Sequence, residues 1–123
     1  MQSQMAYIID ALCSIRCGAD DTEEELHAQV SSALAAAGIC AVHEASLAPR
    51  CRIDFLAGDI GIEIKKRRPD RAGLLAQLTR YAACEQIAQL LVVAPRGVSL
   101  PKEIGRKPVT VLALERLWGI FLP

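Results

Sequence analysis

The sequence predicts an α/β fold with a central mixed sheet flanked by helices, in the order helix, three strands, helix, strand, strand. Apolar residues recur at helical spacing over residues 22–37 and again over 70–84. Between those two stretches the pattern changes to the alternation that is typical of strands. A continuous apolar run at 89–94 then ends at Pro95, as expected of a central strand covered on both faces. The length suits one compact domain, so we expect residues 1–123 to form a single unit.

Short sequence motifs predict where the helices begin and end. Residues 5–16 have scattered apolar spacing and predict a short helix. Thr22 followed three residues later by Glu25 matches a capping box, and Gly38 stands where a C-terminal cap is expected, which predicts a long helix between them. Asp70 is the expected N-cap of the second long helix.

The strand pattern predicts a tight hairpin in the middle of the chain. Alternation indicates three strands, at residues 41–47, 51–57 and 60–65. Gly58-Asp59 separates the second from the third and suits a type II′ turn, because glycine supplies the positive φ at the first central position. Further along we expect a loop at 101–105, a strand at 109–114 and a closing helical turn at 115–121.

Composition limits the classes of function. The 14 basic and 14 acidic residues give no net charge, so contact with a polyanion must come from a local patch. Five cysteines, an odd number without a secretory signal before them, argue against a disulfide framework, and we expect a cytoplasmic protein. No apolar run approaches the ~20 residues needed to cross a bilayer, so we expect no membrane contact.

The hairpin concentrates the charged residues that can carry chemistry. The turn at Gly58-Asp59 places Asp54 directly opposite Glu63, on one face of the two strands. Cβ atoms of opposed residues lie roughly 4.5 to 5.5 Å apart, so two carboxylates there repel each other unless a cation lies between them. Mg²⁺ is commonly held by one or two carboxylates with water and phosphate oxygens, which predicts a partial metal site.

Lys65 falls on the same face as Glu63, while Ile60, Ile62 and Ile64 point into the core. Beside a metal, this amine could orient or help to deprotonate an attacking water, or it could steady the negative charge that develops on a phosphodiester. The sequence leaves these roles open.

Three segments together resemble the PD-(D/E)XK, or restriction-endonuclease-like, nuclease superfamily. They are Arg52-Ile53-Asp54-Phe55, Gly61-Ile62-Glu63-Ile64-Lys65 and Gln77-Leu78-Thr79-Arg80-Tyr81. With a helix-borne glutamate before the sheet, the pattern spans about residues 22–94. Ile53 replaces the proline of the family name.

The resemblance implies an α-β-β-β-α-β core and Mg²⁺- or Mn²⁺-dependent hydrolysis of DNA by an endonuclease. It implies Asp54, Glu63 and Glu23 as metal ligands, with Lys65 and Gln77 completing the catalytic site. RNA stays open as a substrate, as do branched against linear DNA, cutting polarity and sequence preference. The rival interpretation is a nucleic-acid-binding or assembly module that keeps the fold without turnover.

Two of these assignments have structural alternatives. Glu23 shares the inward stripe of Leu26 and Val30, but it could be a solvated charge that the helix dipole favours. Gln77 lies on an apolar stripe, which favours a site residue over a core amide satisfied by backbone groups. Three other glutamates could face the metal, namely Glu24, Glu25 and Glu44. Glu44 could equally pair with Arg52.

A basic run follows the presumed active strand. We expect it to bind nucleic-acid phosphates without reading sequence, through Lys66, Arg67, Arg68 and Arg71. His27 and His43 have no evident nucleophile beside them, and we expect capped or surface roles for both. The apolar C-terminal end, with Trp118 and Phe121, could form a homodimer surface or close the core.

Overall fold

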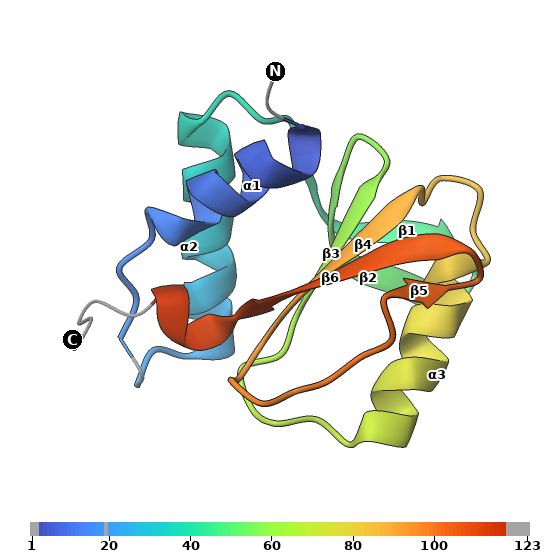
Figure 1. Ribbon diagram of the computed structural model, residues 1–123. Helices are drawn as coiled ribbons and strands as arrows, with labels where there is room; N and C mark the ends of the chain where they lie inside the picture. The colour runs from blue at the N-terminus through green and yellow to red at the C-terminus, as the bar shows by residue number, and fades with distance from the viewer. Residues whose placement is uncertain (1–2, 19, 118–123) are drawn as a thin grey trace.

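A computed structural model describes residues 3–18 and 20–117 and is built around a six-stranded mixed sheet (Figure 1). The spatial order of the strands is β1-β2-β3-β4-β6-β5. Their bounds are β1 Val42–Ala48, β2 Cys51–Ala57, β3 Ile60–Ile64, β4 Gln89–Ala94, β5 Glu103–Ile104 and β6 Lys107–Ala113. The predicted α/β class and mixed sheet are therefore confirmed.

Helices cover both faces of the sheet (Figure 1). They are α1 Gln4–Cys13, α2 Glu23–Ala36 and α3 Arg71–Ala82, with a 3-10 turn, η1, at Leu114–Leu117. Residues of α1 and α2 form one buried cluster with one face of the sheet. Residues of α3 form a second cluster with the other face. The sheet is thus a layer between two separate apolar cores.

The helix caps that the sequence predicts are formed. The Thr22 hydroxyl accepts a hydrogen bond from the Glu25 amide at 3.0 Å, and the Glu25 carboxylate accepts one from the Thr22 amide at 3.2 Å. This reciprocal capping box begins α2. The Asp70 side chain caps α3 with a single hydrogen bond, which it accepts from the Gly73 amide at 2.9 Å. Among the described residues, no helix is long and apolar enough to span a membrane.

The hairpin of β2 and β3 has the predicted register. Phe55 pairs with Ile62 and Ala57 with Ile60, in antiparallel orientation. Gly58 has a φ of +62°, the positive value that the expected turn needs at its first central position. Next along the sheet, β3 pairs with β4 and β4 with β6 in parallel. This arrangement makes β3 and β4 the buried centre of the sheet.

The C-terminal part differs from the prediction. Glu103–Ile104 forms the short strand β5, where a loop was expected, and pairs antiparallel with the start of β6. Gly105 and Arg106, with φ values of +59° and +67°, make the connecting turn. Arginine rarely adopts positive φ, so the sequence carries little signal for this turn. Leu114 begins η1 instead of ending a strand, while Trp118 and Phe121 lie outside the described residues.

Candidate functional site

Strand β2 is twisted at Asp54, so that the buried side chains before and after this residue enter different cores. Ile53 belongs to the cluster under α3, whereas Phe55 belongs to the cluster under α1 and α2. Residues two apart on a regular strand share a face, so β2 must twist sharply between these two positions. Glu44, beside Asp54 on β1, has a φ of +52°, which shows that the neighbouring strand is distorted at the same level.

At this distortion, side chains replace part of the backbone ladder between β2 and β3. One carboxylate oxygen of Asp54 accepts a hydrogen bond from the Ile64 amide at 2.7 Å. One carboxylate oxygen of Glu63 is 3.4 Å from the Asp54 amide that donates to it. The two acids are therefore neighbours as expected, but they lie beyond the last paired residues and are not a simple ladder pair.

The two carboxylates contact side chains from helices on opposite faces of the sheet. The Asp54 carboxylate is 3.8 Å from Nε2 of His27 on α2. The Glu63 carboxylate accepts from the Tyr81 hydroxyl on α3 at 3.1 Å, and its other oxygen lies 3.1 Å from Nζ of Lys65. The expectation that both carboxylates lie on one face of the hairpin is therefore wrong, because Asp54 contacts α2 and Glu63 contacts α3. The site joins the two helical layers through the sheet, at the level where β2 is distorted.

Burial shapes the electrostatics of the acid pair. Glu63 is only 3% exposed, and this desolvation raises its pKa, as does the nearby charge of Asp54, while Lys65 lowers it. Desolvation also raises the pKa of Asp54, against the lowering effects of the Ile64 amide, His27 and Lys65. Each carboxylate is therefore more costly to ionise than in water, and a cation between them would reduce that cost.

The raised pKa of Glu63 predicts a pH-dependent stability. The folded protein holds this proton more tightly than the unfolded chain, so the free energy of unfolding falls as pH rises from the ordinary value of 4.5 through the folded-state pKa. Glu63→Gln cannot titrate, and we expect it to gain stability relative to wild type across that window. Urea unfolding at a series of pH values measures the difference. Exposed Glu103→Gln is the control, and a difference between Glu63→Gln and wild type that does not change with pH would contradict the shift.

Gln77 reaches the acid pair through Tyr81. Its amide nitrogen donates to the Tyr81 hydroxyl at 2.9 Å, and this hydroxyl has both Glu63 and the Arg52 carbonyl, at 2.9 Å, within donating distance. Gln77 is thus brought to the site as predicted, one contact away from Glu63. Tyr81, for which the sequence indicated no role beyond its place in the third segment, is the neighbour of Glu63 that was not predicted. Its buried hydroxyl, which needs a partner, was the available signal.

His27 is buried, and the expectation of a capped or surface histidine is wrong for it. The residue is 9% exposed, its ring packs with His43 and Phe55, and its Nδ1 lies 3.0 Å from Nε2 of His43. Its own Nε2 is buried without a hydrogen-bond partner, although Asp54 is near. The signal in the sequence was its spacing four residues after Glu23, which places both on one side of α2.

The glutamates at the start of α2 lie at the exposed edge of the acid site. A carboxylate oxygen of Glu23 is 3.9 Å from Nε2 of His27, but the Glu23 side chain is 65% exposed. Glu23, Glu24, His27 and Asp54 line one hollow of about 820 Å³. Glu25 forms the capping box with Thr22. Glu44 lines the same hollow and also lies 3.8 Å from the Arg52 guanidinium, so the surface ion pair considered for it is formed.

The basic run borders the acid site on another side. Lys65, Lys66, Arg67 and Arg68 line a second hollow, of about 650 Å³, together with Glu23. Arg68 also donates to the Arg96 carbonyl at 2.9 Å. Arg71 lies apart from this hollow and donates to the Ser99 carbonyl at 3.3 Å. The first four cations are therefore placed to meet a ligand at the site, while Arg71 faces the loop after β4.

Two acids and a histidine are the residues of the site that could contribute ligands to a divalent metal. Among the residues that the structure describes, no three side chains of His, Cys, Asp or Glu form a group that could hold a metal. Asp54 and Glu63 nevertheless offer two neighbouring carboxylates, and His27 offers a buried nitrogen without a partner. Mg²⁺ needs only one or two carboxylates when water and phosphate oxygens supply the rest, so a pair of acids is sufficient.

Comparison with known proteins gives no further guide to this site. No protein-family model matches the chain, and neither a curated protein nor a solved structure matches it.

Proposed function

We propose that this chain is a Mg²⁺- or Mn²⁺-dependent nuclease of the PD-(D/E)XK type that hydrolyses DNA phosphodiester bonds, as an endonuclease. The observation that carries the proposal is the placement of Asp54, Glu63 and Lys65 together where β2 and β3 leave their regular ladder. Two desolvated acids beside an amine are costly for stability alone, and such perturbed groups gather at functional sites.

Each side chain has a role that its contacts support. Asp54 and Glu63 would hold the ion, and the chemistry that the ion supplies when bound is Lewis-acid activation of water and neutralisation of phosphate charge. The Lys65 ammonium, 3.1 Å from Glu63 and 26% exposed, can donate to a water or to a phosphate oxygen. Tyr81 fixes the Glu63 carboxylate by its hydrogen bond, and Gln77 in turn orients the Tyr81 hydroxyl.

The surroundings are consistent with a polyanionic substrate in a reducing compartment. Basic residues line the hollow that contains Lys65, so phosphates on either side of the scissile bond would find cations there. All five cysteines are free thiols, which supports the cytoplasmic setting.

A non-catalytic nucleic-acid-binding module is the second candidate. Both acids already accept hydrogen bonds, Asp54 from a backbone amide and Glu63 from Tyr81, in addition to its ion pair with Lys65. An acid cluster satisfied in this way can hold the two cores together without binding an ion. This alternative keeps DNA or RNA as the partner and lacks turnover.

The decisive experiment compares Asp54→Asn with wild type on a panel of substrates. The panel contains linear, nicked, flapped, four-way-junction and closed circular DNA, and RNA, each with Mg²⁺, with Mn²⁺ and with EDTA. We expect wild type to cut at least one DNA in a metal-dependent manner and Asp54→Asn to lose about 100-fold or more of that rate, because a metal ligand is removed. Cutting of the closed circle would identify an endonuclease.

Asp59→Asn is the matched control, because Asp59 lies at the tip of the same hairpin, between β2 and β3, away from the site. It should cleave like wild type. Cleavage that persists in EDTA, or equal rates for Asp54→Asn and wild type, would reject the nuclease proposal. Metal-independent binding of nucleic acid by wild type, with no cleavage of any substrate, would favour the non-catalytic module.

A further inference from the structure

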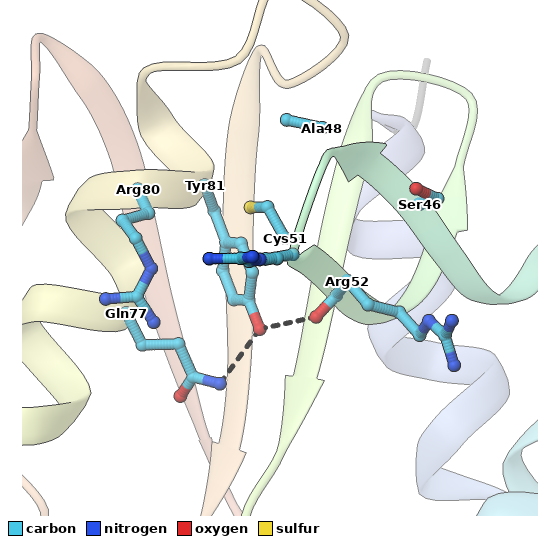
Figure 2. A pocket seen from close by; sticks show the side chains of 8 residues that line it. Ser46, Ala48, Cys51, Arg52, Gln77, Arg80 and Tyr81 are labelled. Atoms are coloured by element: carbon cyan, nitrogen blue, oxygen red, sulfur yellow. Dashed lines mark hydrogen bonds between the residues drawn. The ribbon is translucent and has the colours of Figure 1, made fainter.

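A third hollow, of about 410 Å³, opens between the β1–β2 hairpin and α3 (Figure 2). The residues that matter for its chemistry are Arg50, Arg52, Arg80, Ser46, Gln77 and Tyr81. Its volume falls within the ~300 to 1,000 Å³ of ordinary ligand pockets. None of the basic residues expected to bind nucleic acid from the sequence lines it.

The hollow is strongly cationic for a protein with no net charge. Two of its arginines can present their charge to it: Arg50 from the β1–β2 turn and Arg80 from α3. The Arg52 side chain extends away from Tyr81 (Figure 2), and its guanidinium lies 3.8 Å from Glu44, which lines the hollow beside α2. No aspartate or glutamate lines it. Among the described residues, Arg50 and Arg80 have no carboxylate within salt-bridge distance. The positive charge is therefore available to a ligand.

The hollow is joined to the acid site by Tyr81. Figure 2 shows Arg80 and Gln77 on one side of the Tyr81 ring and Arg52 extending on the other. The Tyr81 hydroxyl is 3.1 Å from the Glu63 carboxylate, whose other oxygen lies 3.1 Å from Lys65. Glu63 thus contacts one lining residue of the arginine hollow and one of the hollow that holds the basic run.

We propose that the arginine hollow is a phosphate-binding subsite that takes a nucleic-acid phosphate beside the acid site. Guanidinium groups donate in a planar fork that matches phosphate oxygens, and Ser46 adds a hydroxyl. The aromatic ring that lines the hollow, Tyr81, is 2% exposed and cannot stack on a base, so the backbone and not the bases is the ligand. The choice of nucleic acid as the ligand rests on the proposed function; the site itself rests on its geometry and charge.

The two hollows together would hold a nucleic-acid strand at two places. With cations in the hollow of the basic run and in the arginine hollow, phosphates on both sides of the acid pair would be bound. Contacts of this kind position a strand without reading its sequence, and each one adds to the salt dependence of binding.

The test measures binding in EDTA, so that cleavage cannot interfere. The probe is a short fluorescein-labelled DNA strand with a 5′-hydroxyl or a 5′-phosphate, and its anisotropy is followed from about 50 to 200 mM salt. The variants are Arg80→Gln, which keeps a good helix former, and Arg50→Asn, because Arg50 has a φ of +59° that asparagine tolerates. Arg106→Asn is matched to the second variant, since Arg106 also lies in an exposed turn, with a φ of +67°.

We expect each hollow variant to weaken binding several-fold and to reduce the slope of log affinity against log salt by about 0.7 to 1. Arg106→Asn should bind like wild type. A larger loss on the 5′-phosphorylated strand would assign the subsite to a terminal phosphate, and equal losses would assign it to an internal one. Unchanged affinity and slope in both hollow variants, or no binding of either strand by wild type, would overturn the subsite.

These results separate the subsite from the nuclease proposal. Loss of binding in Arg50→Asn and Arg80→Gln, with no cleavage by wild type in the substrate panel, would uphold the subsite and reject the nuclease. Cleavage that depends on Asp54, with binding unaffected by either arginine, would uphold the nuclease and reject the subsite.

Discussion

Lys65→Met is expected to reduce metal-dependent cleavage by at least about 100-fold, the usual cost of removing one donor that stabilises developing charge. Methionine keeps the unbranched apolar stem of lysine as far as Cε but lacks the ammonium that lies 3.1 Å from Glu63. Initial rates on the best substrate of the panel, with saturating Mn²⁺, provide the measurement. Exposed Lys102→Met serves as the control for loss of one positive charge.

The same substitution should also destabilise the fold, and the two effects are measured separately. Without Lys65, the buried Glu63, which is 3% exposed, loses its cation, which should cost about 1–3 kcal/mol. Adding Glu63→Gln removes the unpaired charge, so the double variant should regain stability in urea unfolding. Because Glu63 is itself a proposed metal ligand, cleavage is compared in the single variant Lys65→Met, at a temperature at which circular dichroism shows it fully folded. A wild-type rate for folded Lys65→Met would mean that Lys65 acts only through the fold.

Gly61→Ala should be the most destabilising of the small substitutions in the hairpin. A Cβ atom at Gly61 would lie 2.6 Å from Cδ1 of Ile53, 2.7 Å from Cδ1 of Ile87 and 3.1 Å from Cδ2 of Leu90. All three neighbours are buried side chains that cannot turn outward. Overpacking of this kind costs about 1–3 kcal/mol. Because Ile53 precedes Asp54, we also expect reduced cleavage.

Ile53→Val tests the cause, because it removes the Cδ1 atom closest to the new methyl group. Alone it should lose about 0.5–1.5 kcal/mol, but combined with Gly61→Ala it should relieve part of the clash. The free energies of unfolding should therefore be non-additive in the favourable direction. Strict additivity, or a Gly61→Ala protein as stable as wild type, would contradict the packing described here.

Much of the hairpin could be predicted from local sequence. Gly58 sets the turn, and a period of two then determines that Ile60, Ile62 and Ile64 face one core and Glu63 the other. Thr22 and Glu25 likewise begin α2 through contacts three residues apart. Such features depend on near neighbours in the chain, so the residues themselves carry the signal.

Only part of the candidate site could be predicted from local sequence. Asp54, Glu63 and Lys65 were identified together because they share one hairpin. The roles of His27 and Tyr81 were missed, because each residue reaches the acids from a helix that packs on a different face of the sheet. Periodicity places such residues on an inward stripe and cannot show which atom meets a distant side chain.

By itself, the sequence determined the α/β order of elements, the helix caps and the register that brings residues 54 and 63 to neighbouring positions. Tertiary structure alone decided the change of face at Asp54, the burial of His27 and the gathering of arginines beside Tyr81. Caps and turns are settled by groups a few bonds apart, whereas these last features arise when separate helices pack against a twisted sheet. Their geometry is a property of the whole fold.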